Sequence, residues 1–181
     1  MIAPGVDVDV LRQLPILEGL TEAECAQIGE IAEVANFQAG ESIIEQGTSS
    51  QVLWIVLEGT CEVLMRFDGS GADRPPTILA ELGPQSNFGE MSFFHRAPHS
   101  ASVRAKTPVK LLRIERTRFD ALIPCEGNAA CKVALNTIET LAERLRRMGQ
   151  WVAELAADKP PHRREPEWNQ LRTKVFDGWK L

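Results

Sequence analysis

Two hydrophobic rhythms divide this chain, and each predicts a different secondary structure. Between Val34 and Ile114, short apolar runs alternate with glycines, a pattern typical of short β-strands joined by turns. From residue 128 to residue 157, apolar residues recur three and four positions apart, which predicts one long helix. The strands are expected at 42–44, 52–57, 61–65, 77–80, 102–105 and 109–114. Many short strands at close spacing favour a barrel or a sandwich.

Helical patterns flank the strand region on both sides. Before it, residues 14–33 contain the capping-box pair Thr21 and Glu24, followed by apolar residues at helical spacing. After it, residues 116–123 predict a second short helix, which ends near Pro124. The chain is therefore expected to be mainly β, with helices at both ends.

The long helix has the most regular periodicity in the chain. Its apolar positions follow an a/d heptad pattern, which favours a seam between two helices. These positions are Cys131, Ala134, Ile138, Leu141, Leu145, Met148, Val152 and Leu155. A helix that lies on its own barrel needs a similar stripe, but about thirty helical residues span roughly 45 Å, more than a small barrel covers. We therefore expect the outer part of the seam to pair with a second copy of the chain.

The last residues, 158–181, are expected to form a linker and a short tail. Prolines interrupt the segment up to Pro166, and the residues after it place apolar side chains near helical spacing: Trp168, Leu171, Val175 and Trp179. Such an amphipathic tail can dock on its own protein, on a dimer mate or on another protein.

Composition narrows the possible functions. The chain has 181 residues and a formal net charge of −5 at pH 7, which does not favour a general affinity for nucleic acid. No apolar run reaches membrane-spanning length and no signal segment opens the chain, so we expect a cytoplasmic protein without membrane insertion. No C-x-x-C pair and no histidine at zinc-ligand spacing accompany the cysteines, which are expected to be buried thiols without a metal. They are Cys25, Cys61, Cys125 and Cys131.

The chemistry of the chain is concentrated between Phe88 and Val103. Gly89 permits a positive φ or a close backbone approach, and Glu90 after it is an acceptor suited to ribose hydroxyls. Residues 91–96 fit a short helical turn whose free N–H groups would attract a phosphate. Ser100 and Ser102 add hydroxyl donors. Residues 88–103 thus predict an anion pocket.

The order of motifs around this pocket resembles the cyclic nucleotide-binding domain of Crp–Fnr regulators, kinase regulatory subunits and gated channels. The matching motifs lie at 17–21, 40–44, 46–47, 53–56, 58–59, 82–84, 88–90 and 98–103, with Phe119 in the helix that follows. The resemblance implies an antiparallel jelly-roll barrel with flanking helices at 11–127, a dimerisation helix at 128–157 and no metal.

The same resemblance implies roles for individual residues and a ligand such as cAMP or cGMP. The residues that match ligand-binding positions are Phe88, Gly89, Glu90, Met91, Pro98, His99, Ser100 and Ala101. Glu90 corresponds to the glutamate that hydrogen-bonds the ribose 2′-hydroxyl, and Ser100 to a phosphate contact. His99 stands where the family has the arginine that clamps the cyclic phosphate. Trp151 is a candidate to cap the base.

The histidine changes the expected affinity. Arginine is permanently charged and offers a fork of donors, whereas neutral histidine offers one donor and no charge. A charge-assisted hydrogen bond contributes roughly 1.5–3 kcal/mol, so its loss weakens binding by about one to two orders of magnitude. Arg96, three residues earlier, is a possible substitute. Three alternatives stay open: a cyclic nucleotide, another phosphate-containing or anionic ligand, or an empty barrel that serves as a structural subunit.

Output is expected through proteins rather than DNA. In Crp–Fnr regulators a helix-turn-helix domain follows the long helix, and too few residues follow Ala157 here to form one. Ligand binding would therefore be signalled through the long helix to a dimer mate, or through the tail to a protein partner. An enzyme is the rival class, because Glu90, His95 and His99 lie close in sequence, but no nucleophile elbow, metal set or phosphate loop accompanies them. We expect a binding protein and not an enzyme.

Overall fold

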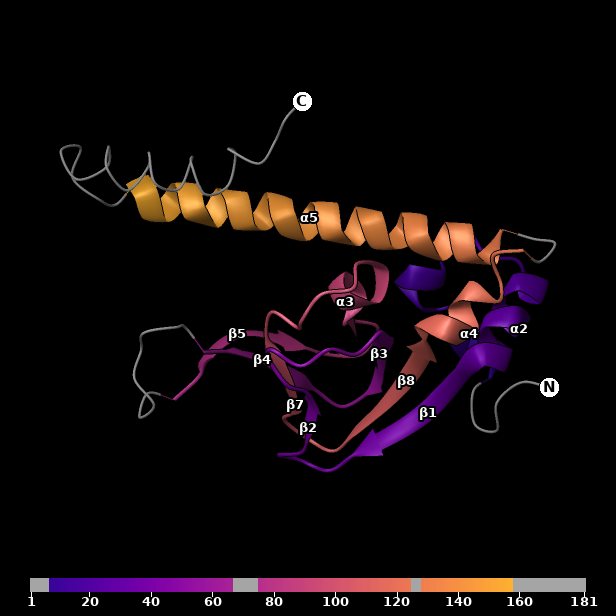
Figure 1. Cartoon of the computed structure of the whole chain (residues 1–181), viewed down its shortest axis with the longest axis horizontal. Coiled ribbons are helices and arrows are strands. Elements are labelled where there is room, and N and C mark those ends of the chain that lie inside the picture. The colour runs from indigo at the N-terminus through magenta and orange to yellow at the C-terminus, as the bar shows by residue number, and fades with distance from the viewer. Residues whose placement is uncertain (1–6, 67–74, 125–127, 158–181) are drawn as a thin grey trace. The chain divides into compact units, whose positions relative to one another are not determined.

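The computed structural model describes residues 7–66, 75–124 and 128–157, and the chain divides into two units at residues 1–137 and 138–181. Within the described residues, the first unit contains every strand and all helices except the outer part of α5 (Ala129–Ala157), which continues into the second (Figure 1). The tail predicted at 158–181 and Cys125 lie outside the described residues.

Two four-stranded antiparallel sheets form the jelly roll of the first unit. One sheet has the strand order β1-β8-β3-β6, and the other has the order β2-β7-β4-β5. The strands are β1 (Ala32–Phe37), β2 (Ser42–Ile44), β3 (Val52–Glu58), β4 (Cys61–Met65), β5 (Thr77–Leu82), β6 (Asn87–Phe88), β7 (Ser102–Ala105) and β8 (Val109–Glu115). All six predicted strands are present, whereas β1 and β6 were not predicted.

Strands β3 and β8 divide the interior into two hydrophobic clusters. Successive side chains of a strand point to opposite faces. Leu53 and Ile55 of β3 accordingly join one cluster, while Trp54 and Val56 join the other. In the same way, β8 gives Leu112 and Ile114 to the first cluster and Val109 and Leu111 to the second. The sheet that contains β3 and β8 thus lies between the two clusters and contributes side chains to both.

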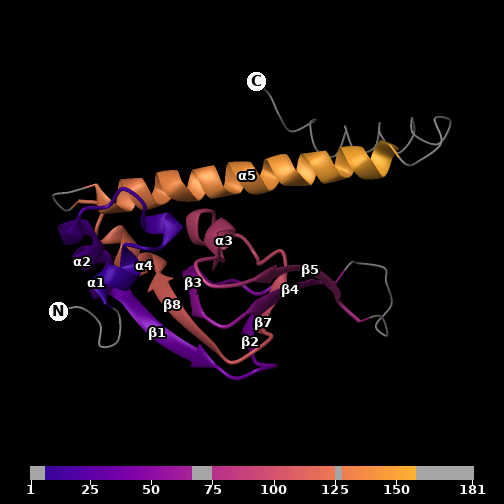
Figure 2. The same cartoon turned by 180° about the vertical axis from the view of Figure 1, so that it is seen from behind.

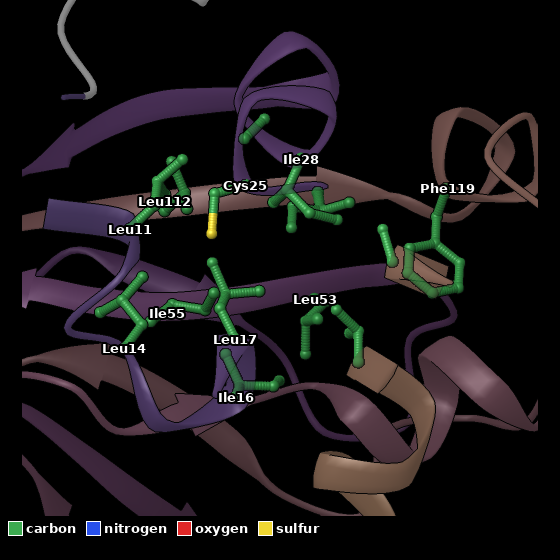
Figure 3. Packing of buried hydrophobic residues seen from close by; sticks show 14 of the residues in the cluster. Leu11, Leu14, Ile16, Leu17, Cys25, Ile28, Leu53, Ile55, Leu112 and Phe119 are labelled. Atoms are coloured by element: carbon green, nitrogen blue, oxygen red, sulfur yellow. The ribbon is translucent and has the colours of Figure 1, made fainter. Parts of the chain in front are cut away.

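Short helices cover the first cluster. They are α1 (Val8–Leu11), the 3₁₀ turn η1 (Pro15–Leu17), α2 (Glu22–Ile31) and α4 (Arg116–Asp120). Both views show β1 and β8 side by side, with α2 and α4 near the end where β1 begins and β8 ends (Figures 1 and 2). Leu17, Cys25, Ile28 and Phe119 point into this cluster with Leu53 (Figure 3).

The predicted helix at 14–33 is wrong in its boundaries. Pro15 starts a separate 3₁₀ turn, and Gly19 takes a φ of 74°, which breaks the helical path before Thr21. The capping box of Thr21 and Glu24 is confirmed, and the helix that it starts ends at Ile31 because β1 begins at the next residue. Pairing of β1 with β8 therefore takes the last residues from the predicted helix.

The long helix matches its predicted range, but its buried positions in the first unit are not those of the heptad. Ala129, Val133 and Thr137 are buried there, whereas Cys131 is exposed. At about 100° per residue, the buried residues lie roughly a quarter of a turn from the heptad stripe. Cys131 therefore contradicts the expectation of a buried thiol, while Cys25 and Cys61 are buried as expected and burial raises the pKa of Cys61 to about 11.

In the second unit the heptad stripe is largely open. Ile138, Leu145 and Met148 are 57–60% exposed, and Leu141 and Val152 are half-buried. The side chains of Trp151 and Leu155 lie outside the described part of the structure. The stripe therefore presents large apolar side chains that are only partly covered within one chain.

A single carboxylate connects α2 with the start of α5. Glu24 Oε2 accepts the backbone N–H of Thr21 at 2.8 Å and the ammonium group of Lys132 at 2.6 Å. Its Oε1 accepts the N–H of Asn128, the residue before α5, at 3.0 Å. Hydrogen bonding from Lys132, followed by that from Thr21, lowers the pKa of Glu24 to about 2. We name this group the Glu24 latch.

None of the helices in residues 7–66, 75–124 and 128–157 is long and apolar enough to cross a membrane. The same ranges contain no group of three or more histidine, cysteine, aspartate or glutamate side chains placed to hold a metal ion.

Candidate ligand-binding site

Gly89 fixes the turn that opens the site. Its φ of 82° lies in the left-handed region, and a Cβ atom built on it would stand 2.6 Å from the carbonyl oxygen of Val52. Both reasons given for a glycine at this position are therefore met: the positive φ and the close backbone approach. Phe88, just before it, pairs with Trp54 of β3, and their rings stack at 6.3 Å. The turn is thus held against the centre of a sheet.

The helix α3 (Glu90–Phe94) follows this turn directly and positions Glu90. Glu90 is only 4% exposed, while Met91 beside it is 60% exposed. Phe93 is fully buried and packs edge-on against Phe119 of α4 at 5.2 Å. Arg116 Nη1 also donates to the carbonyl oxygen of Phe93 at 2.8 Å. The helix that carries Glu90 is therefore fixed to α4.

His99 is bound by two serine side chains. Its Nε2 lies 2.7 Å from Ser50 Oγ, and its Nδ1 lies 3.1 Å from Ser92 Oγ. Ser50 precedes β3, and Ser92 belongs to α3. His99 is 6% exposed and Ser92 is buried, whereas Ser50 is exposed. We name the three side chains the Ser–His–Ser clasp.

The main chain holds the same histidine. The N–H of His99 donates to Thr48 O at 2.8 Å, and its carbonyl oxygen accepts the N–H of Gly47 at 2.9 Å. Two backbone and two side-chain hydrogen bonds therefore connect His99 to its surroundings. Three of these four bonds reach residues 47–50, so the clasp fastens that loop to the segment after α3.

The clasp is electrically neutral near pH 7. Burial lowers the pKa of His99 below its ordinary value of 6.5, so the imidazole is uncharged. A neutral imidazole has one donor and one acceptor nitrogen. Both tautomers satisfy the clasp, because a serine hydroxyl can donate or accept. No positive charge therefore stands at the position where the family resemblance implies the arginine clamp.

The other predicted site residues lie at different depths. Phe88 is buried, Ala101 is half-buried, and Pro98 and Ser100 are exposed. The hydroxyl of Ser102, predicted to add a donor to the pocket, accepts the N–H of Gln46 at 3.0 Å next to the β2–β7 pairing.

Arg96, the possible substitute for the clamp, is an exposed residue. Two further arginines near this region have other partners: the Nε of Arg104 donates to Glu62 at 2.8 Å and the Nε of Arg116 donates to Asp120 at 2.7 Å.

Ser50 and Ser92 are the site residues that the sequence analysis missed. Ser92 lies within the motif, but a serine in a short helix carries no signal of its own. Ser50 stands 49 positions before His99, and only the folded loop brings it within hydrogen-bond distance. The polar run Thr48, Ser49 and Ser50 after Gly47 was the one available hint.

Comparisons with known proteins identify the family of this fold. A family profile described as "Cyclic nucleotide-binding domain" matches residues 34–124. A cyclic nucleotide-binding domain from Methylobacillus flagellatus is similar in fold, with a TM-score of 0.71 at 17% identity over 81% of this chain and 80% of that one.

Two further solved structures are closer in sequence. The catabolite activator protein of Thermus thermophilus is 30% identical, with a TM-score of 0.67 over 78% of this chain and 62% of that one. The regulatory subunit of a cAMP-independent protein kinase A from Trypanosoma cruzi, bound to guanosine, is 27% identical, with a TM-score of 0.60 over 93% of this chain. This chain spans 50% of that subunit, so it corresponds to part of each of these two proteins.

Proposed function

Because the chain belongs to the cyclic nucleotide-binding domain family, we propose that it is a regulatory module that binds a cyclic nucleotide or a related nucleoside ligand. The single observation that carries this proposal is the buried Glu90 directly after the left-handed Gly89. In the family, the glutamate at this position accepts a hydrogen bond from the ribose 2′-hydroxyl. The remaining proposed contacts are Phe88, Met91, Pro98, His99, Ser100 and Ala101.

The ligand class is broader than the two common cyclic nucleotides. The guanosine in the Trypanosoma cruzi subunit is a nucleoside held by a related chain that is described as cAMP-independent. cAMP, cGMP and uncharged nucleosides are therefore the ligands to test. All of them carry a ribose that Glu90 can hold as a hydrogen-bond acceptor.

We propose that ligand occupancy reaches α5 through α3 and α4. Phe93 of α3 packs on Phe119 of α4, and both belong to the cluster that includes Ala129, Ala130 and Val133 of α5. A ligand that favours one position of α3 therefore biases the start of α5 by linkage. Trp151 stays the candidate base cap.

The receiver of the signal is proposed to be a second copy of the chain. Ile138, Leu145 and Met148 are largely exposed within one chain, and burying them between two helices removes apolar surface from water. The alternative receiver is a protein partner bound by the residues after 157. The module is proposed to act in the cytoplasm, without DNA contacts and without a metal.

Calorimetry with cAMP, cGMP, adenosine and guanosine tests the binding proposal. Glu90→Gln is expected to weaken every ligand that binds by about tenfold or more, because the charged acceptor is lost. The 2′-deoxy ligands should bind the variant and the unaltered protein alike. Glu22→Gln, an exposed residue in the first turn of α2, is the matched control. Absence of binding at millimolar concentration of all four ligands would leave a ligand-free structural subunit.

Sedimentation tests the dimer. Replacing Leu141 and Leu145 with lysine places charges on the heptad stripe and should convert dimers to monomers. Glu139→Lys, an exposed position of the same helix, should leave the dimer intact. An unchanged dimer in the double variant would contradict the seam.

Catalysis is the competing function, and one observation favours testing it. The exposed Ser50 is hydrogen-bonded to a histidine that a third side chain orients, which is the arrangement of a nucleophile and its base. A turnover assay with cAMP and cGMP is expected to show no hydrolysis. Hydrolysis that Ser50→Ala abolishes would replace the regulatory proposal with an enzymatic one.

A further inference from the structure

We infer that the site selects an uncharged ribonucleoside over a cyclic nucleotide, because the Ser–His–Ser clasp offers a hydroxyl where a phosphate needs a cation. This inference rests on the proposed function, since it assumes that Glu90 holds a ribose. It adds the charge of the preferred ligand, which neither the family nor Glu90 determines.

Both ring nitrogens of His99 already take part in hydrogen bonds. Nε2 is bound to Ser50 and Nδ1 to Ser92, so His99 can contact a phosphate directly only if one of these bonds breaks. A buried charge is costly unless an opposite charge or several hydrogen bonds accompany it. A cyclic phosphate at this position would find a neutral ring and would also open the clasp.

One side chain of the clasp, that of Ser50, is exposed to solvent. His99 and Ser92 are buried, and Ser50 is the exposed end of the three. A hydroxyl both donates and accepts a hydrogen bond. It therefore matches the free 3′- and 5′-hydroxyls of a nucleoside ribose, which in a 3′,5′-cyclic nucleotide are esterified to phosphate and can no longer donate, while the 2′-hydroxyl stays free in both ligand classes.

The segment around the clasp carries few charged side chains. Residues 88–101 contain one acidic residue, Glu90, and one arginine, Arg96. Arg96 is exposed, and Arg104 and Arg116 on neighbouring elements are bonded to Glu62 and Asp120. A neutral ligand satisfies this segment without requiring any of these arginines to change partner.

Backbone hydrogen bonds fix the position of the clasp. The backbone bonds of His99 to Gly47 and Thr48 fix the ring relative to the loop that carries Ser50. The donor and acceptor positions are therefore set before a ligand arrives, which reduces the entropy lost on binding. Such a fixed site favours the ligand that fits its hydrogen-bond pattern.

Calorimetry on the full chain at pH 7.5 tests the inference directly. Adenosine or guanosine is expected to bind with a Kd at least tenfold lower than that of the matching cAMP or cGMP. The nucleoside Kd should also stay constant as salt is raised, because no ion pair forms. Equal or tighter binding of the cyclic nucleotide would overturn the inference and leave the proposed function standing. Failure of all four ligands to bind would instead overturn the proposed function.

Two variants sharpen the test. His99→Arg is expected to tighten cAMP or cGMP by at least tenfold and to weaken the nucleoside, which reverses the preference. Ser50→Ala should weaken the nucleoside about threefold to tenfold with no loss for the cyclic nucleotide. Ser49→Ala, the exposed neighbour, is the control. If His99→Arg does not fold, the Ser50→Ala result decides, and an equal loss for both ligand classes contradicts the inference.

Discussion

The Glu24 latch and the Ser–His–Ser clasp are two polar clusters, each centred on a buried side chain, that are built in opposite ways. The latch holds a carboxylate that accepts hydrogen bonds from an ammonium group and from two backbone N–H groups. The clasp holds a neutral imidazole between two hydroxyls. Each connects segments far apart in the sequence, so the difference lies in charge and not in reach.

The contrast teaches where this fold uses charge. At the start of α5 the position of a helix must be fixed, and hydrogen bonds to a charged group are the stronger kind. Beside the candidate ligand site, a fixed positive charge would favour anions, and a neutral cluster avoids that preference. We therefore expect the latch to dominate stability and the clasp to dominate ligand choice.

The largest expected effect comes from removing the latch. Glu24→Ala should lower the free energy of unfolding by about 3 kcal/mol, because Lys132 and two N–H groups lose a buried acceptor. Urea denaturation measures this loss. Glu22→Ala in the same helical turn is exposed and should change stability by less than about 0.5 kcal/mol. Equal losses in the two variants would mean that the latch carries no special weight.

The acid limb of stability isolates the charged part of the latch. The folded-state pKa of Glu24 is about 2, below the ordinary 4.5, so the unfolded chain binds more protons between these values. The contribution is present above pH 4.5 and is lost as the pH falls towards 2. Glu24→Gln should flatten this part of a stability–pH curve. A curve that keeps its full slope in the variant would contradict the assignment.

Opening the clasp should cost less than opening the latch. Ser92→Ala removes one neutral hydrogen bond to a buried ring, so the expected loss is about 1 kcal/mol. Ser50→Ala should cost about 0.5 kcal/mol or less, because this serine is exposed and water can replace it. Chemical denaturation of the two variants measures both values. The reverse order would mean that Ser50, and not Ser92, holds the histidine.

The smallest expected effect is a pH dependence of the clasp. Burial holds the pKa of His99 in the folded state below 6.5, so its contribution to stability is present above pH 6.5 and is lost as the pH falls through the folded-state pKa. His99→Gln should remove this slope. The two slopes have different origins, so each single variant should remove one of them and a double variant should lack both. Loss of both slopes in one single variant would contradict the separate origins.

The sequence predicted the fold better than it predicted the ends of the individual helices and strands. Three strands, 42–44, 61–65 and 102–105, have the observed ends, because glycine or polar turns bound their apolar runs. The strand β1 was missed because its residues, with alanine and asparagine among them, lack a strong apolar alternation. Its strand conformation comes from pairing with β8, which is a tertiary effect that local pattern does not show.

The candidate site was predicted in part for a similar reason. The positive φ of Gly89 was predicted from a short local motif. The partners of His99 were not, because Ser50 reaches it across 49 positions of sequence. In the latch, the local bond of Glu24 to Thr21 was predicted, whereas its bond to Lys132, 108 positions away, was not.

The alternation of side chains along β3 makes this strand sensitive to insertions and deletions of a single residue. Trp54 stacks on Phe88 beside the candidate ligand site, while Leu53 and Ile55 on either side of it belong to the cluster that the helices cover. Inserting or deleting one codon between them would exchange the two sets of side chains in a single step. A point substitution in β3 therefore affects one face of the sheet, whereas a one-residue insertion or deletion would disturb both the candidate ligand site and the cluster on which the start of α5 packs.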